Sequence, residues 1–210
     1  MSKPIVYLGP SLPLEEARKI LDADYRPPVK RGDLTSVEGA DTVVIIDGVF
    51  LQSCSVGHRE ILRVLKAGVK VIGGGSMGAL RAAEMKRYGM IGVGKIFEMY
   101  SSGEIEGDDE VALVFDPETL EPLSEPLVNV RFLLNEAVEH NVISAETRQQ
   151  LLKSFRSIYY PRRTKQAFKS TIASIKGGEE ADRLNRYFED NYRDIKKEDA
   201  IALLQSVKQL

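Results

Sequence analysis

The sequence contains a single cysteine, Cys54, so no disulfide can form within the chain. It has no apolar run that approaches the roughly 20 residues of a membrane-spanning helix, and no secretion signal is recognisable at its start. The net charge is only −2, so no overall field draws the chain to nucleic acid or to a membrane surface. These absences predict a cytoplasmic protein that needs neither of those partners.

The glycine-rich part of the sequence is interpreted as lacking both nucleotide-binding motifs, G-x-G-x-x-G and G-x-x-x-x-G-K-[ST]. A nucleotide-binding α/β protein would rest on the glycines alone, and we rank that interpretation last. No cofactor and no metal are predicted from the residues that remain.

Short apolar segments alternate with amphipathic ones in the first half of the chain. Strands are predicted at residues 5–9, 41–48 and 69–75, and helices at residues 14–21, 55–68 and 77–89. Such alternation is typical of a parallel sheet with crossover helices. We therefore expect an α/β protein with a Rossmann-like parallel sheet core over residues 1–120.

The second half of the chain has a helical pattern. A connector rich in proline and acidic residues spans residues 116–126, and the preceding residues 90–116 indicate a helix, an acidic loop and a strand. Five further helices are predicted, at residues 128–140, 145–158, 163–176, 179–192 and 197–208. We expect residues 121–210 to form a helical C-terminal region. Its helices could dock on the sheet, form an interface in a homo-oligomer or hold another partner.

Unusual residues gather where three predicted strands end. The ends carry Gly9, Pro10 and Ser11, then Asp47 and Gly48, then Gly73, Gly74, Gly75 and Ser76. Ligands of open parallel sheets bind at the carboxyl ends of the strands. Glycines let backbone N–H groups approach a ligand, and the helix after the third strand aims its positive end at the same place. The pattern predicts a site for a phosphate, a carboxylate or a developing oxyanion.

Ser76 has two interpretations. Residues 74–78, "GGSMG", match the G-x-S-x-G elbow, which raises a nucleophilic serine on a strand-to-helix turn. A nucleophile needs a base, and His58 is the nearby imidazole. Three carboxylates could orient that imidazole: Asp47, Glu60 and Glu84. The alternative is that Ser76 caps a helix and His58 is a solvated residue of a first helical turn.

Two charged segments remain. Residues 104–110, "EIEGDDE", carry five carboxylates, but their spacing matches no ordered metal-binding loop, so a solvated loop or a docking patch is favoured. Residues 155–169 interleave basic and aromatic side chains, which could bind RNA or an acidic protein. A solvated helix face over a buried aromatic stripe is the favoured interpretation of that segment.

Seven blocks in this order resemble the TfuA-like core family. They are "VYLGPSLP" (6–13), "PPVKRGDL" (27–34), "IIDGVF" (45–50), "HREIL" (58–62), "GGSMGALRAAEM" (74–85), "GMIGVG" (89–94) and "DDEVAL" (108–113). Each block alone is weak, but the ordered set is specific. The resemblance covers roughly residues 4–116, with "VNVRFLLNEAV" (128–138) similar to the usual continuation.

The resemblance implies a role beside a YcaO-type enzyme, which uses ATP to convert a backbone amide to a thioamide. TfuA-like proteins are associated with the supply of sulfur for that reaction, through hydrolysis of the thiocarboxylate at the C-terminus of a ubiquitin-fold sulfur carrier. The implied target in methanogenic archaea is a glycine of methyl-coenzyme M reductase. In bacteria, it is a ribosomal peptide. The alternative is a non-catalytic adaptor that docks the carrier and activates YcaO.

With that role, the strand-end residues acquire hypothetical functions. Hydrolysis of a thiocarboxylate passes through an oxyanion, which the backbone at Gly75, Ser76 and Met77 suits. Ser76 would attack or position a water, and His58 would accept the proton with Asp47 nearby. The remaining substrate-binding candidates are Ser11, Arg31, Asp33 and Arg81.

Overall fold

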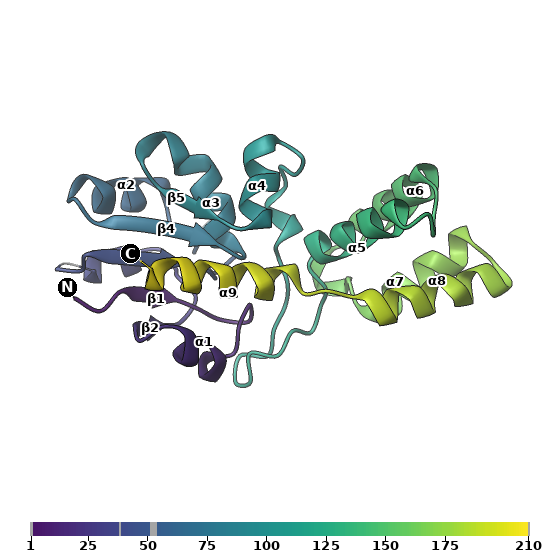
Figure 1. Ribbon diagram of the computed structural model, residues 1–210, viewed down its shortest axis with the longest axis horizontal. Coiled ribbons are helices and arrows are strands. Elements are labelled where there is room, and N and C mark those ends of the chain that lie inside the picture. Colours follow the sequence, from purple (N-terminus) through teal and green to yellow (C-terminus); the bar gives the residue numbers. More distant parts are fainter. Residues whose placement is uncertain (1, 38, 51–53, 210) are drawn as a thin grey trace. The chain divides into compact units, whose positions relative to one another are not determined.

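The computed structural model describes residues 2–37, 39–50 and 54–209. The chain divides into two compact units, Met1–Asp108 with Ile195–Leu210, and Asp109–Asp194 (Figure 1). We call them the sheet unit and the helical unit. This division differs from the predicted regions 1–120 and 121–210, because the helical unit begins earlier and the last helix belongs to the sheet unit.

Five parallel strands form the sheet, in the order β2-β1-β3-β4-β5. They are β1 (Ile5–Tyr7), β2 (Asp24–Arg26), β3 (Thr42–Ile45), β4 (Lys70–Gly74) and β5 (Ile91–Val93). The predicted Rossmann-like α/β fold class is confirmed. The edge strands β2 and β5 were not predicted as strands, because β2 is polar and β5 is interrupted by glycine, so neither shows the apolar run that marks β1.

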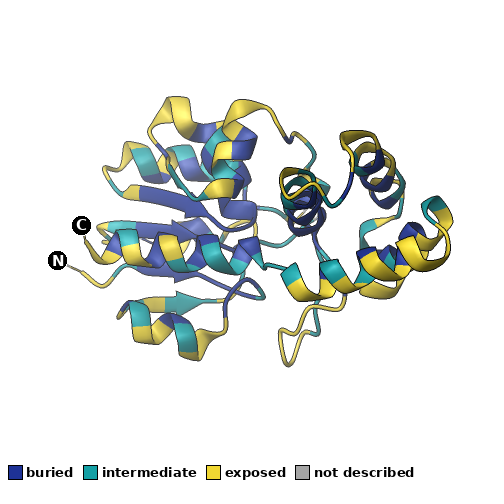
Figure 2. Cartoon of the chain, turned by 45° about the vertical axis from the view of Figure 1, so that its right-hand side comes forward, coloured by how far each residue is buried: buried dark blue, intermediate teal, exposed yellow. Residues whose placement is uncertain are grey.

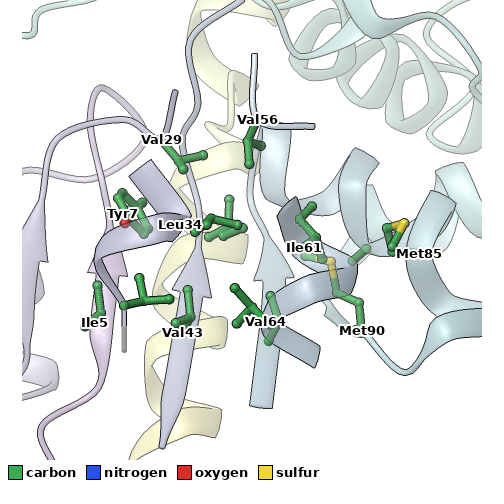
Figure 3. Packing of buried hydrophobic residues seen from close by; sticks show 14 residues of the cluster. Ile5, Tyr7, Val29, Leu34, Val43, Val56, Ile61, Val64, Met85 and Met90 are labelled. Carbon is green, nitrogen blue, oxygen red and sulfur yellow. The ribbon is translucent and has the colours of Figure 1, made fainter. Parts of the chain in front are cut away.

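One face of the sheet packs against α2 (His58–Lys66) and α3 (Met77–Met85). The strands supply Ile5, Tyr7, Val43, Ile45 and Val71 to this layer, and the helices supply Ile61, Val64, Ala82 and Met85 (Figure 3). The odd-numbered residues of β1 and β3 share this face because successive side chains in a strand point to opposite sides.

The other face packs against α1 (Leu14–Ile20) and α9 (Ile195–Lys208). Its apolar layer joins Val6, Val44, Ile46 and Ile72 to Ala17, Ala200, Leu203 and Leu204. Figure 2 shows the strands as mainly buried, whereas the helices alternate buried and exposed residues. Burial on both faces explains why β3 is apolar at every position after Thr42.

The C-terminal helix α9 also caps α4 (Lys95–Ser102), a helix packed beside β5. The carboxylate of Asp199 is buried and accepts hydrogen bonds from the backbone N–H groups of Lys95, at 2.9 Å, and Ile96, at 2.8 Å. Helix N-termini leave such donors without intrahelical partners. A residue about a hundred positions away along the chain therefore supplies the cap that the local sequence at Gly94 lacks.

This cap gives a pH-dependent prediction. Burial raises the pKa of Asp199 above its ordinary value. A raised folded-state pKa means that the carboxyl contributes most to stability below its unfolded pKa, and that this contribution is lost as the pH rises through the folded pKa. We expect Asp199→Ala to lower the free energy of unfolding by about 1 kcal/mol, the usual cost of a lost cap.

The Asp199→Asn variant does not titrate at this position. The free energy of unfolding of the variant, relative to that of the wild type, should therefore increase as the pH rises through the acidic range. At higher pH the difference between the two proteins should stay constant. Urea denaturation at a series of pH values measures the difference. A difference that does not change with pH would contradict the assigned environment.

The helical unit contains α5 (Leu127–Glu139), α6 (Ala145–Arg156), α7 (Lys165–Ile175) and α8 (Gly178–Asn191). These helices agree with four of the predicted ones. Their core includes Leu134, Leu151, Phe155, Ile172 and Leu184, all fully or almost fully buried. Ser144 and Thr164 cap α6 and α7 by accepting hydrogen bonds from the N–H groups three residues later.

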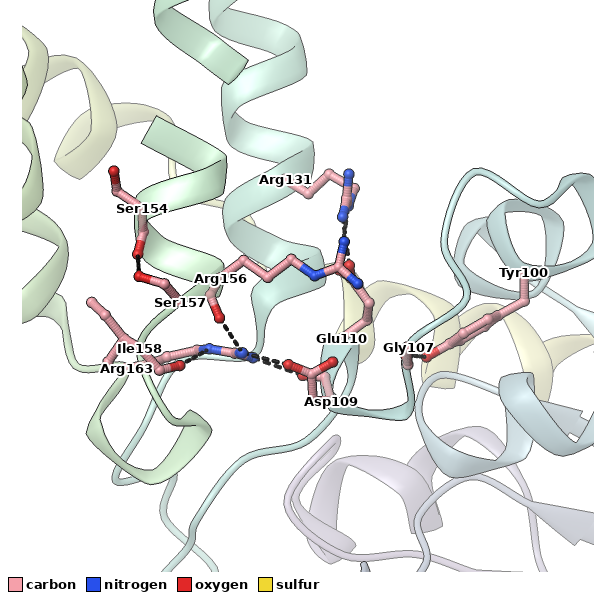
Figure 4. Close-up of polar contacts among 10 residues, drawn as sticks. All are labelled: Tyr100, Gly107, Asp109, Glu110, Arg131, Ser154, Arg156, Ser157, Ile158 and Arg163. Carbon is pink, nitrogen blue, oxygen red and sulfur yellow. Dashed lines mark hydrogen bonds and ion pairs between the residues drawn. The ribbon is translucent and has the colours of Figure 1, made fainter. Parts of the chain in front are cut away.

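The acidic segment 104–110 is not wholly a solvated loop or docking patch. Glu110 is 1% exposed and pairs with Arg131, at 2.5 Å from Nη2 to Oε1. Arg163 is 2% exposed and donates to the Asp109 carboxylate and to the Asp109 backbone carbonyl, the latter at 2.9 Å (Figure 4). That interpretation is therefore wrong for Asp109 and Glu110, whose carboxylates hold the first residues of the helical unit to its helices.

The structure differs from the prediction at two more segments. The predicted strand before residue 116 is reduced to one bridge, between Phe115 and Pro122. In the basic segment 155–169, Phe155, Arg163 and Phe168 are buried, which agrees with the aromatic stripe but not with a fully solvated basic face. Over the residues that the structure describes, no helix is both long and apolar enough to cross a membrane.

Candidate functional site

The strand order places a topological switch point between β1 and β3, whose connections leave in opposite directions across the sheet. Ligands of doubly wound sheets commonly bind in the crevice at that point. Here the crevice is closed by Asp47. Its Oδ2 accepts hydrogen bonds from the N–H groups of Gly9, at 2.9 Å, and Ser11, at 3.1 Å, and its Oδ1 accepts from the Ser11 hydroxyl at 2.7 Å.

Asp47 and Ser11 are both 2% exposed, and their polar groups bind one another. Asp47 and His58, both described, make no contact with each other, so the structure does not support the hypothesis that Asp47 orients His58. The Ser11 hydroxyl, predicted to bind substrate, already donates its hydrogen bond to Asp47. The backbone carbonyl of Asp47 also accepts from the N–H of Val29, at 2.9 Å. This pair therefore fastens the ends of β1 and β3 together.

At the end of β4, unlike at the switch point, polar groups of the described residues remain without hydrogen-bond partners. Gly75 has φ of 71°, which favours glycine, and turns the chain from β4 into α3. The N–H of Ser76 donates to the Gly74 carbonyl at 2.8 Å, and the N–H of Gly78 donates to the Ile46 carbonyl at 3.1 Å. Among the described residues, the N–H groups of Gly75 and Met77 have no hydrogen-bond partner.

The Ser76 hydroxyl is the notable group at this turn. The residue is 5% exposed, stands at the N-cap position of α3 and makes no side-chain capping bond. Its Oγ has no hydrogen-bond partner among the described residues. Ser76 is therefore the N-cap residue of α3, as the second interpretation expects, but its hydroxyl binds none of the N–H groups that a capping side chain would bind. A free hydroxyl thus lies beside two free N–H donors at the positive end of a helix.

Two glycines of this segment allow helix and sheet to come close. A Cβ on Gly78 would lie 1.7 Å from the Ile45 carbonyl oxygen, and one on Gly73 would lie 2.2 Å from the Gly78 carbonyl oxygen. Gly73 and Gly78 are therefore required for packing. With Gly75 they also have the spacing G-x-G-x-x-G between a strand and a helix, so the interpretation that the sequence lacks this motif is wrong.

That spacing is the fingerprint of a dinucleotide site only in a wider context. The fingerprint needs an acidic residue about 20 positions further on, to bind a ribose hydroxyl. The next strand, β5, ends at Val93 and is followed by Gly94 and Lys95. The close-packing function of the glycines is thus present, whereas the carboxylate at that spacing, Glu98, is exposed and stands in α4 rather than at the end of β5.

His58 lies in a different network from Ser76. Its Nε2 is 2.8 Å from Oε2 of Glu84, and the same oxygen accepts from Nη1 of Arg81 at 2.6 Å. Arg81 also donates through Nε to the Val56 carbonyl, at 3.1 Å. Of the three carboxylates proposed to orient the imidazole, the structure selects Glu84.

Ser76 and His58 are not hydrogen-bonded to each other in this structure. Glu84 follows Ser76 by eight residues, which is about 12 Å along a helix axis. The imidazole, with its side chain 54% exposed, therefore meets α3 well beyond the serine. The predicted serine–histidine pair would need the His58 side chain to leave Glu84.

The loop of Arg31 and Asp33 is held by backbone contacts. Asp33 accepts the N–H of Lys30 at 2.9 Å, the N–H of Gly32 donates to Glu60 at 2.7 Å, and the N–H of Arg31 donates to the Cys54 carbonyl at 2.7 Å. The Arg31 residue is exposed. Its loop follows Val29, which pairs with Gly48 just beyond β3, so it lies at the carboxyl edge of the sheet.

No group of three histidine, cysteine, aspartate or glutamate side chains in the described part of the chain is arranged to hold a metal ion. The site is instead one of backbone donors and a hydroxyl at the end of a central parallel strand. The fold is that of a doubly wound α/β protein, and its β4–α3 turn has donors of the kind that bind anions in other proteins of this class.

Comparison with known families is consistent with that class. The chain belongs to the TfuA-like protein family, whose model matches residues 47–164, from Asp47 at the end of β3 to Thr164 before α7. The matched segment includes the turn of Ser76 and the His58–Glu84 network. No curated protein matches the sequence.

Proposed function

We propose that this protein supplies sulfide to a YcaO-type enzyme by hydrolysing the C-terminal thiocarboxylate of a ubiquitin-fold carrier at the turn between β4 and α3. The observation that supports the proposal is that the Ser76 hydroxyl and the N–H groups of Gly75 and Met77 have no hydrogen-bond partner in the part of the chain that the structure describes. Membership of the TfuA-like family supports the same role. The sulfide would serve thioamidation of a peptide backbone, such as a glycine of methyl-coenzyme M reductase.

The site suits the charge of this substrate. A thiocarboxylate is an anion, and its attack by water or by a hydroxyl places further negative charge on the acyl oxygen. The N–H groups of Gly75 and Met77 can donate to that oxygen, and the N-terminal dipole of α3 adds to the field. One donor of this kind is worth about 3 kcal/mol of the barrier.

The reaction balances without a cofactor. Water adds to the acyl carbon, the carbon–sulfur bond breaks, and R–COS⁻ with H₂O gives R–COO⁻ with H₂S. In one form the Ser76 oxygen forms an ester that water then opens. In the other form Ser76 only positions the water. His58 would accept the proton after it exchanges Glu84 for the serine, and Arg31 at the rim would contact the carrier's tail.

The test is sulfide release from a thiocarboxylated ubiquitin-fold carrier, with and without YcaO. We expect Ser76→Ala to lower the rate about a hundredfold while the fold is retained, since an active-site hydroxyl is lost and little packing changes. Ser170→Ala, which removes a hydroxyl from an exposed position of α7, is the matched control and should leave the rate unchanged. Equal rates in both variants would exclude Ser76 from the chemistry.

One observation favours a second function. Because His58 is bound to Glu84, no imidazole is placed to activate Ser76 in this structure. The chain would then be a non-catalytic adaptor that docks the carrier and activates YcaO. In that case wild type releases no sulfide alone, and Ser76→Ala leaves thioamidation by YcaO unchanged.

His58→Ala separates the two forms of the catalytic proposal. If His58 moves to the serine, its loss lowers sulfide release as far as the loss of Ser76 does. If the imidazole only ties α2 to α3, the rate stays close to that of the wild type.

The glycine spacing also suggests a nucleotide-binding function. If the protein bound NAD or ATP, the nucleotide would raise its melting temperature.

A further inference from the structure

Lys196 is a buried charged residue that the proposed function does not use. It is 2% exposed, whereas every other lysine that the structure describes is exposed or half-buried. Burying an ammonium group removes it from water at a cost in free energy, so lysine is seldom covered to this extent. Such a residue is a candidate for a function that requires a positive charge away from solvent.

The backbone of Lys196 lies beside the turn between β4 and α3. A Cβ on Gly75 would be 3.3 Å from the Lys196 carbonyl oxygen and 3.5 Å from the Ala200 backbone nitrogen. Both segments belong to the sheet unit, and Figure 1 shows α9 beginning at the edge where the β4 arrow ends. The first turn of α9 therefore stands next to the residue that precedes Ser76.

The register of α9 against β4 sets the direction of the Lys196 side chain. A Cβ on Gly74 would lie 3.2 Å from Leu203, about one turn after Ala200 along α9. Residues nearer the start of α9 therefore lie progressively beyond the strand end. Lys196 precedes Ala200 by four positions and Leu203 by seven, which places it on the same buried stripe of the helix. Since side chains tilt toward the N-terminus of a helix, that of Lys196 extends past the end of β4, at the carboxyl edge of the sheet.

The electrostatics of this edge suit an anion. The positive ends of α3 and α9 meet at Gly75, and the ammonium group of Lys196 adds a full charge to these partial ones. The buried carboxylates nearby are held by donors of the protein itself. Asp47 accepts three hydrogen bonds at the switch point, and Asp199 accepts two from the start of α4.

We propose that the ammonium group of Lys196 binds the negatively charged C-terminus of the sulfur carrier at the β4–α3 turn. This inference rests on the proposed function and adds a substrate-binding residue to it. The thiocarboxylate is an anion when it binds, and attack on its carbon places further negative charge on the acyl oxygen. The cation stabilises both states, whereas the N–H groups of Gly75 and Met77 hold the acyl oxygen as its charge develops.

The test is calorimetric binding of two forms of a ubiquitin-fold sulfur carrier to the full chain. One form has a free C-terminal carboxylate, the product of the proposed hydrolysis, and the other ends in an amide. Wild type should bind the carboxylate form at least about tenfold more tightly. Lys196→Met, which removes the charge and keeps an apolar side chain of similar length, should bind both forms equally.

Lys197→Met is the matched control. Lys197 is the next residue of α9, is half-buried and pairs with Glu16, at 2.8 Å from Nζ to Oε2. This variant removes a charge from the same helical turn but from a different face of α9. It should keep the preference for the carboxylate form that wild type shows.

A second measurement needs no variant, so it remains decisive even if Lys196→Met does not fold. A carbodiimide joins the C-terminal carboxylate of the bound carrier to an amine that it contacts, and mass spectrometry identifies the lysine. We expect the carrier's C-terminus to be joined to Lys196. Cross-links from that C-terminus to other lysines alone would contradict the proposal.

Two calorimetric results would also overturn it. One is a wild type that does not bind the carrier or does not prefer the carboxylate form. The other is the same preference in Lys196→Met as in wild type, which is expected of a lysine that serves only an ion pair within the protein. Sulfide release is measured separately. If wild type binds the carboxylate through Lys196 yet releases no sulfide, the hydrolysis fails and the binding site stands.

Discussion

Gly78→Ala should destabilise the sheet unit by about 3 kcal/mol or more, although alanine is the better helix former. Helix propensity alone predicts a gain of about 1 kcal/mol from this change. A Cβ at residue 78 would lie 1.7 Å from the Ile45 carbonyl oxygen and 2.6 Å from its carbon. These are backbone atoms of β3, so no rotamer change can relieve the overlap and α3 must move off the sheet.

Urea denaturation measures this loss, and the sulfide assay should lose activity with it, because the donors at Gly75 and Met77 move with α3. Gly177→Ala is the matched control, since a Cβ there has no neighbour within 4 Å and φ is −94°. The control should change the free energy of unfolding by no more than about 0.5 kcal/mol. A Gly78→Ala variant as stable as the wild type would mean that α3 does not lie this close to β3.

Arg131→Met is expected to destabilise the helical unit by about 3–5 kcal/mol, because it leaves the carboxylate of Glu110 buried without its cation. Glu110 is 1% exposed, and its two oxygens accept from Nε and Nη2 of Arg131 at 3.2 and 2.5 Å. The lost stability reflects the cost of leaving a buried carboxylate unpaired more than the net contribution of the ion pair. The double variant Arg131→Met with Glu110→Leu should therefore regain most of the stability.

The comparison needs an exposed pair of the same kind in the same unit. Lys176 and Glu180 are 3.2 Å apart with side chains 27% and 47% exposed, and Lys176→Met should cost no more than about 1 kcal/mol. Guanidinium denaturation of the four proteins gives both numbers. If Arg131→Met costs no more than Lys176→Met, the Glu110 carboxyl is either solvated or paired elsewhere.

Local patterns were sufficient for much of the fold. The continuous apolar run of β3 indicated a strand buried on both faces, and the structure places Val43 and Ile45 on one face and Val44 and Ile46 on the other. The helices α5 to α8 were visible because each carries its apolar residues at helical spacing over at least ten positions. The glycine–serine turn after β4 could be predicted from the sequence because three consecutive glycines followed by serine are a rare combination.

The errors concern contacts between residues far apart in the chain. Asp109 and Glu110 looked solvated because nothing in their own segment pairs with them, whereas their arginines stand at 163 and 131. Asp47 looked like a partner for His58, but the folded chain gives it Ser11 and gives His58 Glu84. No period in the sequence specifies which of several carboxylates a distant group will meet.

The sequence by itself determined the class of fold, the family and the turn at which Ser76 stands, because these follow from residue types at short spacing. Only the tertiary structure decided that the last helix covers the sheet, that Asp47 closes the switch point, and that the Ser76 hydroxyl and two N–H groups find no partner among the described residues. Those outcomes depend on which polar groups meet across the strand ends. Each donor or acceptor takes the nearest partner in space, and that neighbour is set by the packing of the sheet and its helices.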